Sequence, residues 1–124
     1  PSKRKLAYYL GVLLLMSIFA HSAYGKVTNL TQTYDLIVKK NIPWPVLSTG
    51  FAVFIQLFTI YFLYQKLAKN KNTSLAKLGI KGLGVFTLAT IYYFHNIFTD
   101  PSQANHFYKN LSIIGGLVIL HETL

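Results

Sequence analysis

The sequence predicts an all-α fold, a bundle of four transmembrane helices in one membrane domain covering residues 1–124. Three observations lead to this prediction. Hydrophobic residues make up 52% of the chain and charged residues only 12%, whereas soluble domains carry about 25% charged residues. No charged residue interrupts three stretches of 20, 25 and 18 residues, at 6–25, 41–65 and 82–99. A helix of about 20 residues crosses the hydrocarbon core of a bilayer, so each stretch is close to spanning length.

The first predicted span covers residues 6–25. It follows a basic start and in that respect resembles a secretory signal. Its apolar stretch is long, however, and His21 is too bulky for a small-residue cleavage site that would end at Ala23. We therefore expect a retained transmembrane helix here.

The segment between the first and second spans allows two interpretations. Apolar side chains recur in it at helical spacing, at Leu30, Tyr34, Ile37 and Val38. This pattern is typical of a short amphipathic helix on the membrane surface, but an ordinary polar loop explains it as well. The sequence IPWP at 42–45 then breaks the chain, because proline disfavours helix before it and suits a helix start. The second span is predicted at 46–65, with Trp44 at the headgroup level.

The third and fourth spans are predicted at 78–98 and 106–123. A basic turn, KLAKNKNTSLAK at 66–77, leads into the third span, and the turn TDPSQAN leads out of it. The fourth apolar stretch holds only 12 residues between Lys109 and Glu122. It reaches spanning length if the helix begins near His106 and Lys109 extends its ammonium group back to the interface.

The distribution of lysine and arginine predicts the orientation of the chain in the membrane. The side that holds the N-terminus and the 66–77 turn carries eight of these residues, and the other side carries four. Positively charged residues favour the cytoplasmic side. We therefore expect a multi-pass protein of the cell membrane with both termini in the cytoplasm.

Charge and composition also exclude several classes of function. The net charge of +9 could indicate nucleic-acid binding, but the basic residues flank the apolar stretches, so we expect no nucleic-acid partner. The chain has no cysteine, which excludes a disulfide and any thiolate-bound metal or iron–sulfur cluster within it. No catalytic motif occurs. We expect no catalytic activity of its own and no required cofactor.

Polar and small residues within the spans predict which helix faces pack together. A polar or imidazole group that faces lipid without a partner costs several kcal/mol, so we expect such faces to turn inward. The predicted inward faces are Ser17, His21 and Tyr24 in the first helix; Thr49, Ala52, Gln56 and Thr59 in the second; Thr87, Thr90, His95 and Asn96 in the third; and His106 and Asn110 in the fourth. Glycines 79, 82, 84, 115 and 116 indicate close helix contacts.

Candidate ligand-binding residues follow from these faces. The alternating topology puts His21, His95 and His106 near the outer end of the bundle at similar depth. Three histidines at one level could bind a metal or a quinone headgroup, and two could ligate haem. The alternatives are a small polar ligand pocket around Gln56, or plain hydrogen bonding between helices. The ligand-site hypothesis therefore names His21, Gln56, His95, His106 and Asn110, with no metal assigned.

Several segments resemble the DoxX family of small four-helix membrane proteins, over roughly residues 8–121. The resemblance rests on SAYGK at the end of the first helix, on NIPWPVLSTGFAVFIQLF, and on YYFHNIFTDPSQANHFYKNLSIIGGLVIL. Family members often have a glutamate in the middle of the second helix, where this chain has Gln56. An amide does not titrate, so the resemblance does not imply proton transfer at this position.

The resemblance implies an integral protein of the bacterial cytoplasmic membrane that is surrounded by lipid and associates with other membrane subunits or with itself. Relatives are linked to quinone-coupled sulfur oxidation and to membrane oxidoreductase complexes. It therefore predicts a non-catalytic accessory subunit of a redox or envelope complex. The alternatives are a quinone- or haem-associated oxidoreductase subunit, and a small transporter or chaperone-like membrane protein with a polar pocket around Gln56.

Overall fold

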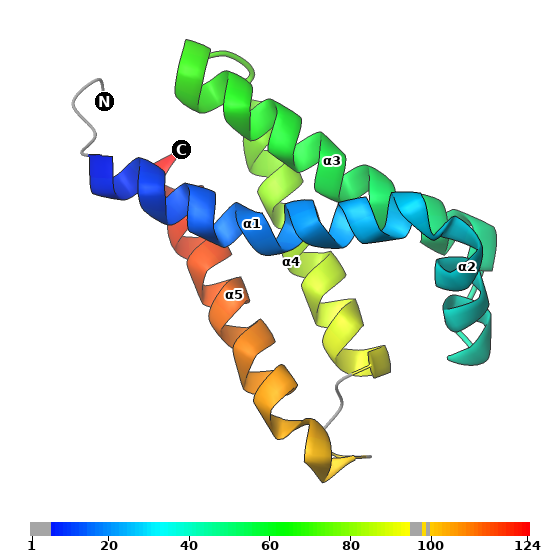
Figure 1. The fold of residues 1–124 in the computed structure, drawn as a ribbon. Coiled ribbons are helices and arrows are strands. Elements are labelled where there is room, and N and C mark those ends of the chain that lie inside the picture. Colours follow the sequence, from blue (N-terminus) through cyan, green and yellow to red (C-terminus); the bar gives the residue numbers. More distant parts are fainter. Residues whose placement is uncertain (1–5, 95–97, 99) are drawn as a thin grey trace.

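The computed structural model describes residues 6–94, 98 and 100–124, and over these residues the chain forms helices and no strand (Figure 1). The elements in chain order are α1 (Leu6–Thr28), α2 (Leu30–Lys39), α3 (Pro45–Lys69), α4 (Thr73–Phe94), the short 3-10 helix η1 (Pro101–Gln103) and α5 (Ala104–Thr123). The predicted all-α fold is confirmed.

The four long helices alternate in direction, so α1 and α4 run one way and α3 and α5 run the other (Figure 1). The helix pairs α3–α4 and α4–α5 have the most extensive contacts, and α1 lies across α3. The first turn of α1 lies close to the last turn of α5, where the Tyr8 hydroxyl is 2.7 Å from the Thr123 hydroxyl. The start of α1 and the end of α5 therefore share one end of the molecule, as predicted.

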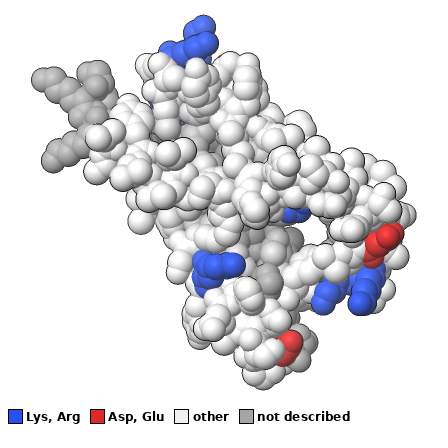
Figure 2. Space-filling model, viewed as in Figure 1, with Lys and Arg blue, Asp and Glu red and all other residues white. Residues whose placement is uncertain are grey.

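Three of the described helices are long and apolar enough to cross a membrane, namely α1, α3 and α4. Their outer faces carry large apolar side chains, such as Leu13, Phe54 and Val85, that are more than half exposed. Figure 2 shows a wide uncharged surface over α1 and α3, with basic side chains gathered at the α3–α4 turn and beside α2. Lipid can solvate such a surface and water cannot, which makes the chain a multi-pass membrane protein. The helix α5 is not among the three, so the fourth span stays a prediction.

The α3–α4 contact depends on glycine. A Cβ atom on Gly79 would lie 2.7 Å from Thr59 Oγ1 and 3.0 Å from Thr59 Cα, so the two backbones approach as closely as glycine permits. Gly82 likewise faces Ile55, and Gly116 faces Leu15. The predicted role of these three glycines is confirmed. A Cβ on Gly84 or Gly115 would meet no atom within 4 Å, so these two make no close contact within the chain.

The turn between α3 and α4 is shorter than predicted. The predicted basic turn spanned 66–77, but α3 continues to Lys69 and α4 begins at Thr73. Alanine, leucine and lysine favour helix, so the chain reverses over three residues only. Asn70 and Asn72 have positive φ angles, 53° and 58°, a conformation that asparagine tolerates better than most residues.

The connections on the opposite side also follow from local chemistry. The segment between the first and second spans, for which the sequence allowed either a helix or a loop, is the helix α2. Its position on the membrane surface stays a prediction. Trp44, between two prolines, has a left-handed backbone and an exposed side chain before Pro45 starts α3. In the predicted Asp-Pro turn, Asp100 accepts hydrogen bonds from the backbone N–H and the hydroxyl of Ser102, which lower the pKa of its carboxyl.

We predict that Gly79→Ala lowers the free energy of unfolding by about 1–3 kcal/mol, because the new methyl group overpacks the contact with Thr59. Unfolding in detergent micelles, followed by circular dichroism against denaturant, measures this change. Gly84→Ala is the matched control, and its stability should stay unchanged or rise by up to about 1 kcal/mol. Equal effects of the two substitutions would contradict the close α3–α4 contact.

Candidate functional site

The inward face of α3 carries the polar residues that the sequence predicted there. Thr49, Ala52, Gln56 and Thr59 are all buried. The threonine hydroxyls are satisfied within their own helix, since Thr49 donates to the Pro45 carbonyl at 2.8 Å and Thr59 donates to the Ile55 carbonyl at 2.7 Å. A hydroxyl that bonds to the preceding helical turn needs no partner from another helix.

Gln56 differs from these threonines, because its amide makes no hydrogen bond within its own helix. The side chain is 1% exposed, and neither Nε2 nor Oε1 has a hydrogen-bond partner among the described residues. A buried unpaired polar group costs about 1–3 kcal/mol. Hydrogen bonding between helices was the simplest of the interpretations open for Gln56, and the described part of the chain shows no such bond.

Gln56 lines a cavity of about 190 Å³ that we call the polar pocket. All four long helices contribute to its wall. Its polar lining residues are Ser22 and Lys26 from α1, Gln56 from α3, Thr87 and Thr90 from α4, and Lys109 and Asn110 from α5. The pocket wall therefore combines two ammonium groups, two amides and three hydroxyls, and it extends from buried Gln56, Thr87 and Asn110 to exposed Lys109.

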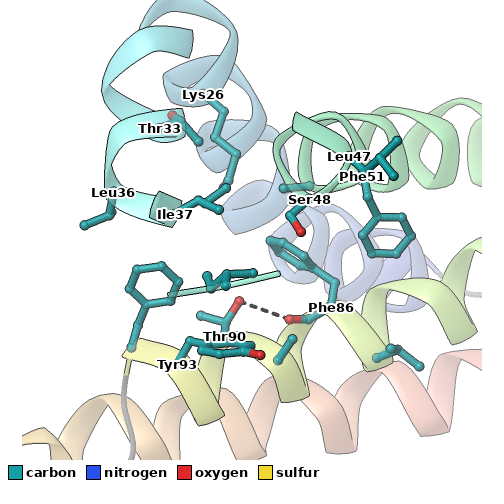
Figure 3. Close-up of a pocket in the computed structure, with 15 residues that line it drawn as sticks. Lys26, Thr33, Leu36, Ile37, Leu47, Ser48, Phe51, Phe86, Thr90 and Tyr93 are labelled. Atoms are coloured by element: carbon teal, nitrogen blue, oxygen red, sulfur yellow. Dashed lines mark hydrogen bonds between the residues drawn. The ribbon is translucent and has the colours of Figure 1, made fainter. Parts of the chain in front are cut away.

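A larger cavity of about 560 Å³, the apolar pocket (Figure 3), shares part of its wall with the polar pocket. Its wall comes mainly from α2, α3 and α4, with side chains such as Leu36, Ile37, Phe51, Val85 and Phe94. Three residues, Lys26, Phe86 and Thr90, line both pockets. A ligand with one polar end and one apolar end matches two adjoining cavities of this kind.

Lys26 occupies the junction of the two pockets. In Figure 3 its side chain extends from α1 toward Phe86. The ammonium group donates to the Ser22 hydroxyl one helical turn earlier, and it lies 5.4 Å from the centre of the Phe86 ring. The chain has three carboxylates, Asp35, Asp100 and Glu122, and none of them lines either pocket.

The predicted ligand-binding residues fall into three groups. Gln56 and Asn110 meet in the wall of the polar pocket, and both are buried. His21 and His106 are exposed and line neither pocket. His95, like its neighbour Asn96 on the predicted inward face, lies outside the described residues. Among the described residues no group of three histidine or carboxylate side chains could hold a metal ion.

The predicted inward face of α1 is wrong. Ser17, His21 and Tyr24 are exposed, and the buried face consists of Met16, Phe19 and Ala23. Apolar residues surround α1 on every side, so its hydrophobic pattern does not select one face. Ser17 needs no inward position because its hydroxyl donates to the Leu14 carbonyl at 2.6 Å. Near the helix end, His21 and Tyr24 suit the polar interface.

Sequence reasoning missed Ser22 and Lys26 as site residues. Lys26 was treated as a charge that flanks the first span, because α1 was expected to end at residue 25. The helix instead continues to Thr28, which places Lys26 one turn after Ser22 on its inner side. The available signal was their i, i+4 spacing, which puts a hydroxyl and an ammonium group on one helix face.

Comparisons of the chain with protein-family models, with curated proteins and with solved structures found no match.

We predict that Gln56→Leu raises the free energy of unfolding of the delipidated protein by about 1–3 kcal/mol, because leucine removes the unpaired amide and keeps a similar shape. Unfolding by denaturant in uncharged detergent measures this change. Thr87→Val, in the same pocket, is the control and should lower stability by about 0.5–1.5 kcal/mol, because the Thr87 hydroxyl donates to the Leu83 carbonyl at 2.8 Å. Lower stability of Gln56→Leu would mean that the amide is already bonded within the protein.

Proposed function

We propose that this chain is a membrane protein that holds a small ligand in the polar pocket around Gln56, as a transporter or a chaperone-like component of the membrane would. The unpaired amide of Gln56 carries this proposal. It is buried among four helices, so neither lipid nor bulk water satisfies it. A ligand that both accepts and donates hydrogen bonds would satisfy it.

The composition of the pocket wall supports the same proposal. A residue retained only for packing would be apolar, because replacing an unsatisfied polar group by an apolar one of the same shape is neutral or stabilising. Asn110 of α5 and Thr87 of α4 line the same cavity as Gln56. Several helices therefore bring polar groups to one point, which is the usual composition of a ligand site.

We propose as a second function that the chain is an accessory subunit of a redox or envelope complex, as the DoxX resemblance implies. The observation that favours it is a shallow groove between α4 and α5, lined by Gly84, Leu88, Leu117 and Val118 among others. Gly84 has open space where a side chain would lie. Small residues on a helix surface let a second transmembrane helix approach closely.

The quinone and haem alternatives differ in their support. A quinone would use the two adjoining pockets, because its carbonyl oxygens accept hydrogen bonds and its tail is apolar. Haem ligation would depend on His21, His95 and His106, and the two of these that are described lie outside both pockets. The pocket geometry therefore favours a quinone over haem as a cofactor.

We predict that the full chain, purified in mild detergent, carries a small molecule enriched relative to bulk membrane lipid. Gln56→Leu should reduce its amount about tenfold, the effect of losing one or two buried hydrogen bonds. Mass spectrometry of organic extracts measures it, and visible absorbance tests for quinone or haem. Gln32→Leu, which changes an exposed glutamine of α2, is the control. Equal amounts of the small molecule in the wild-type, Gln56→Leu and Gln32→Leu proteins would contradict the pocket proposal.

The same preparations test the second function. A protein partner in stoichiometric amount, retained in Gln56→Leu and lost in Gly84→Leu, supports the accessory-subunit proposal. Gly50→Leu is the matched control, since Gly50 likewise has open space where a side chain would lie but is on α3, away from the groove. A clean monomer or homodimer from all preparations would overturn this proposal.

We propose further that α5 is the fourth span and that both termini are cytoplasmic. The chain has no cysteine, so single cysteines report topology without background. An impermeant maleimide should label Asn29→Cys and Asn105→Cys in intact cells, and should label Lys71→Cys and Glu122→Cys only after lysis. Labelling of Glu122→Cys in intact cells would show that α5 does not cross the membrane.

A further inference from the structure

We infer that the two adjoining pockets together bind a single-chain anionic amphiphile such as a long-chain carboxylate, with its head between Lys26 and Gln56 and its alkyl chain in the apolar pocket. This inference rests on the proposed ligand-binding function and names the class of ligand. It depends on three separate observations, which concern charge, unsatisfied hydrogen bonding and the shape of the cavities.

The charge of the polar pocket selects an anion. Lys26 and Lys109 both line it, and no carboxylate of the chain lines either pocket. Within the described residues the one ion pair is His121–Glu122, at 3.9 Å, and these residues line neither pocket. Lys26 is only partly exposed and its ammonium group has the Ser22 hydroxyl as a neutral partner. An anionic oxygen would supply the missing countercharge and a charge-assisted hydrogen bond.

The amide of Gln56 adds hydrogen-bond donors to the two cations. Its Nε2 is buried without a partner in the described structure and carries two N–H groups. Carboxylate oxygens are strong acceptors and have about four lone-pair sites, so one carboxylate accepts from Lys26 and from Gln56 together. A neutral alcohol head would bond to Gln56 but would leave the ammonium groups without a countercharge.

The sizes of the cavities favour a small head and a long chain. The polar pocket, about 190 Å³, is smaller than the ~300–1,000 Å³ of ordinary ligand sites, so it suits a carboxylate better than a bulky lipid headgroup. The apolar pocket, about 560 Å³, falls within that range. Phe86 lies on the wall of both cavities, and Leu36 and Ile37 of α2 line the far side of the apolar pocket (Figure 3).

The test uses the full chain in phosphatidylcholine nanodiscs at mildly alkaline pH, with radiolabelled hexadecanoate and hexadecanol as probes and empty nanodiscs as the blank. We expect saturable binding of hexadecanoate, weakened about tenfold or more by Lys26→Gln, with hexadecanol binding changed by no more than about twofold. Lys39→Gln removes the same charge from an exposed site on α2 and should leave both unchanged. Retained hexadecanol binding shows that the Lys26→Gln protein is folded.

Other outcomes separate this inference from the proposed function. If both probes bind with equal strength and Lys26→Gln affects neither, the anionic ligand class is wrong and the pocket proposal stands. If phosphatidylglycerol displaces hexadecanoate as well as unlabelled hexadecanoate does, the occupant is an ordinary membrane lipid and the single-chain assignment is wrong. If neither probe binds, the inference fails. The proposed function is then tested separately, by comparing the small molecule in organic extracts of the wild-type and Gln56→Leu proteins.

Discussion

The absence of water in the membrane interior is the constraint on which this structure depends. Each polar group at depth must find a partner within the protein, because hydrocarbon offers none. Serine and threonine meet this constraint locally, as Ser17, Thr59 and Thr87 do by donating to a carbonyl one turn earlier. Their helices are then free to turn any face toward lipid. Gln56 has a longer side chain that ends in an amide, and this amide has no hydrogen-bond partner among the described residues. At Gln56 the protein therefore does not meet the constraint.

The same constraint explains how much of the structure the sequence could predict. Charge-free stretches of spanning length located the three apolar helices, since an apolar stretch of about 20 residues can cross lipid as a helix that satisfies its own backbone hydrogen bonds. The face of α3 was predictable because Thr49, Gln56 and Thr59 recur at helical spacing and share one side. The face of α1 was not, because apolar residues surround it. Its orientation comes from the fit of Met16, Phe19 and Ala23 against neighbouring helices, and tertiary packing of this kind has no periodic signal.

The pockets show a second limit of sequence reasoning. The histidines are the most conspicuous chemical groups in the sequence, yet His21 and His106 lie outside both pockets. Histidine near a helix end has access to the interface and therefore needs no inward position. Lysine was read as an anchor for the same reason, but Lys26 extends toward the interior because α1 is three residues longer than the charge-free stretch. A shift of one helical turn at a span end decides whether a charge faces headgroups or a cavity.

The position of Lys26 connects the packing of the helices with the chemistry of the site. Close approach of α3 and α4 at Gly79 and Gly82 leaves α1 and α5 to fill the remaining space around Gln56, and they do so incompletely. Beside Phe86 the polar pocket adjoins the apolar pocket, which is also lined by Ile37, the buried residue of α2. A cavity that is charged at one end and apolar at the other is unstable when empty, because dispersion contacts and a countercharge are both missing. The anionic amphiphile that we propose as the ligand would supply both at once, and this would account for the unpaired amide of Gln56 and the ammonium group of Lys26 lining one cavity.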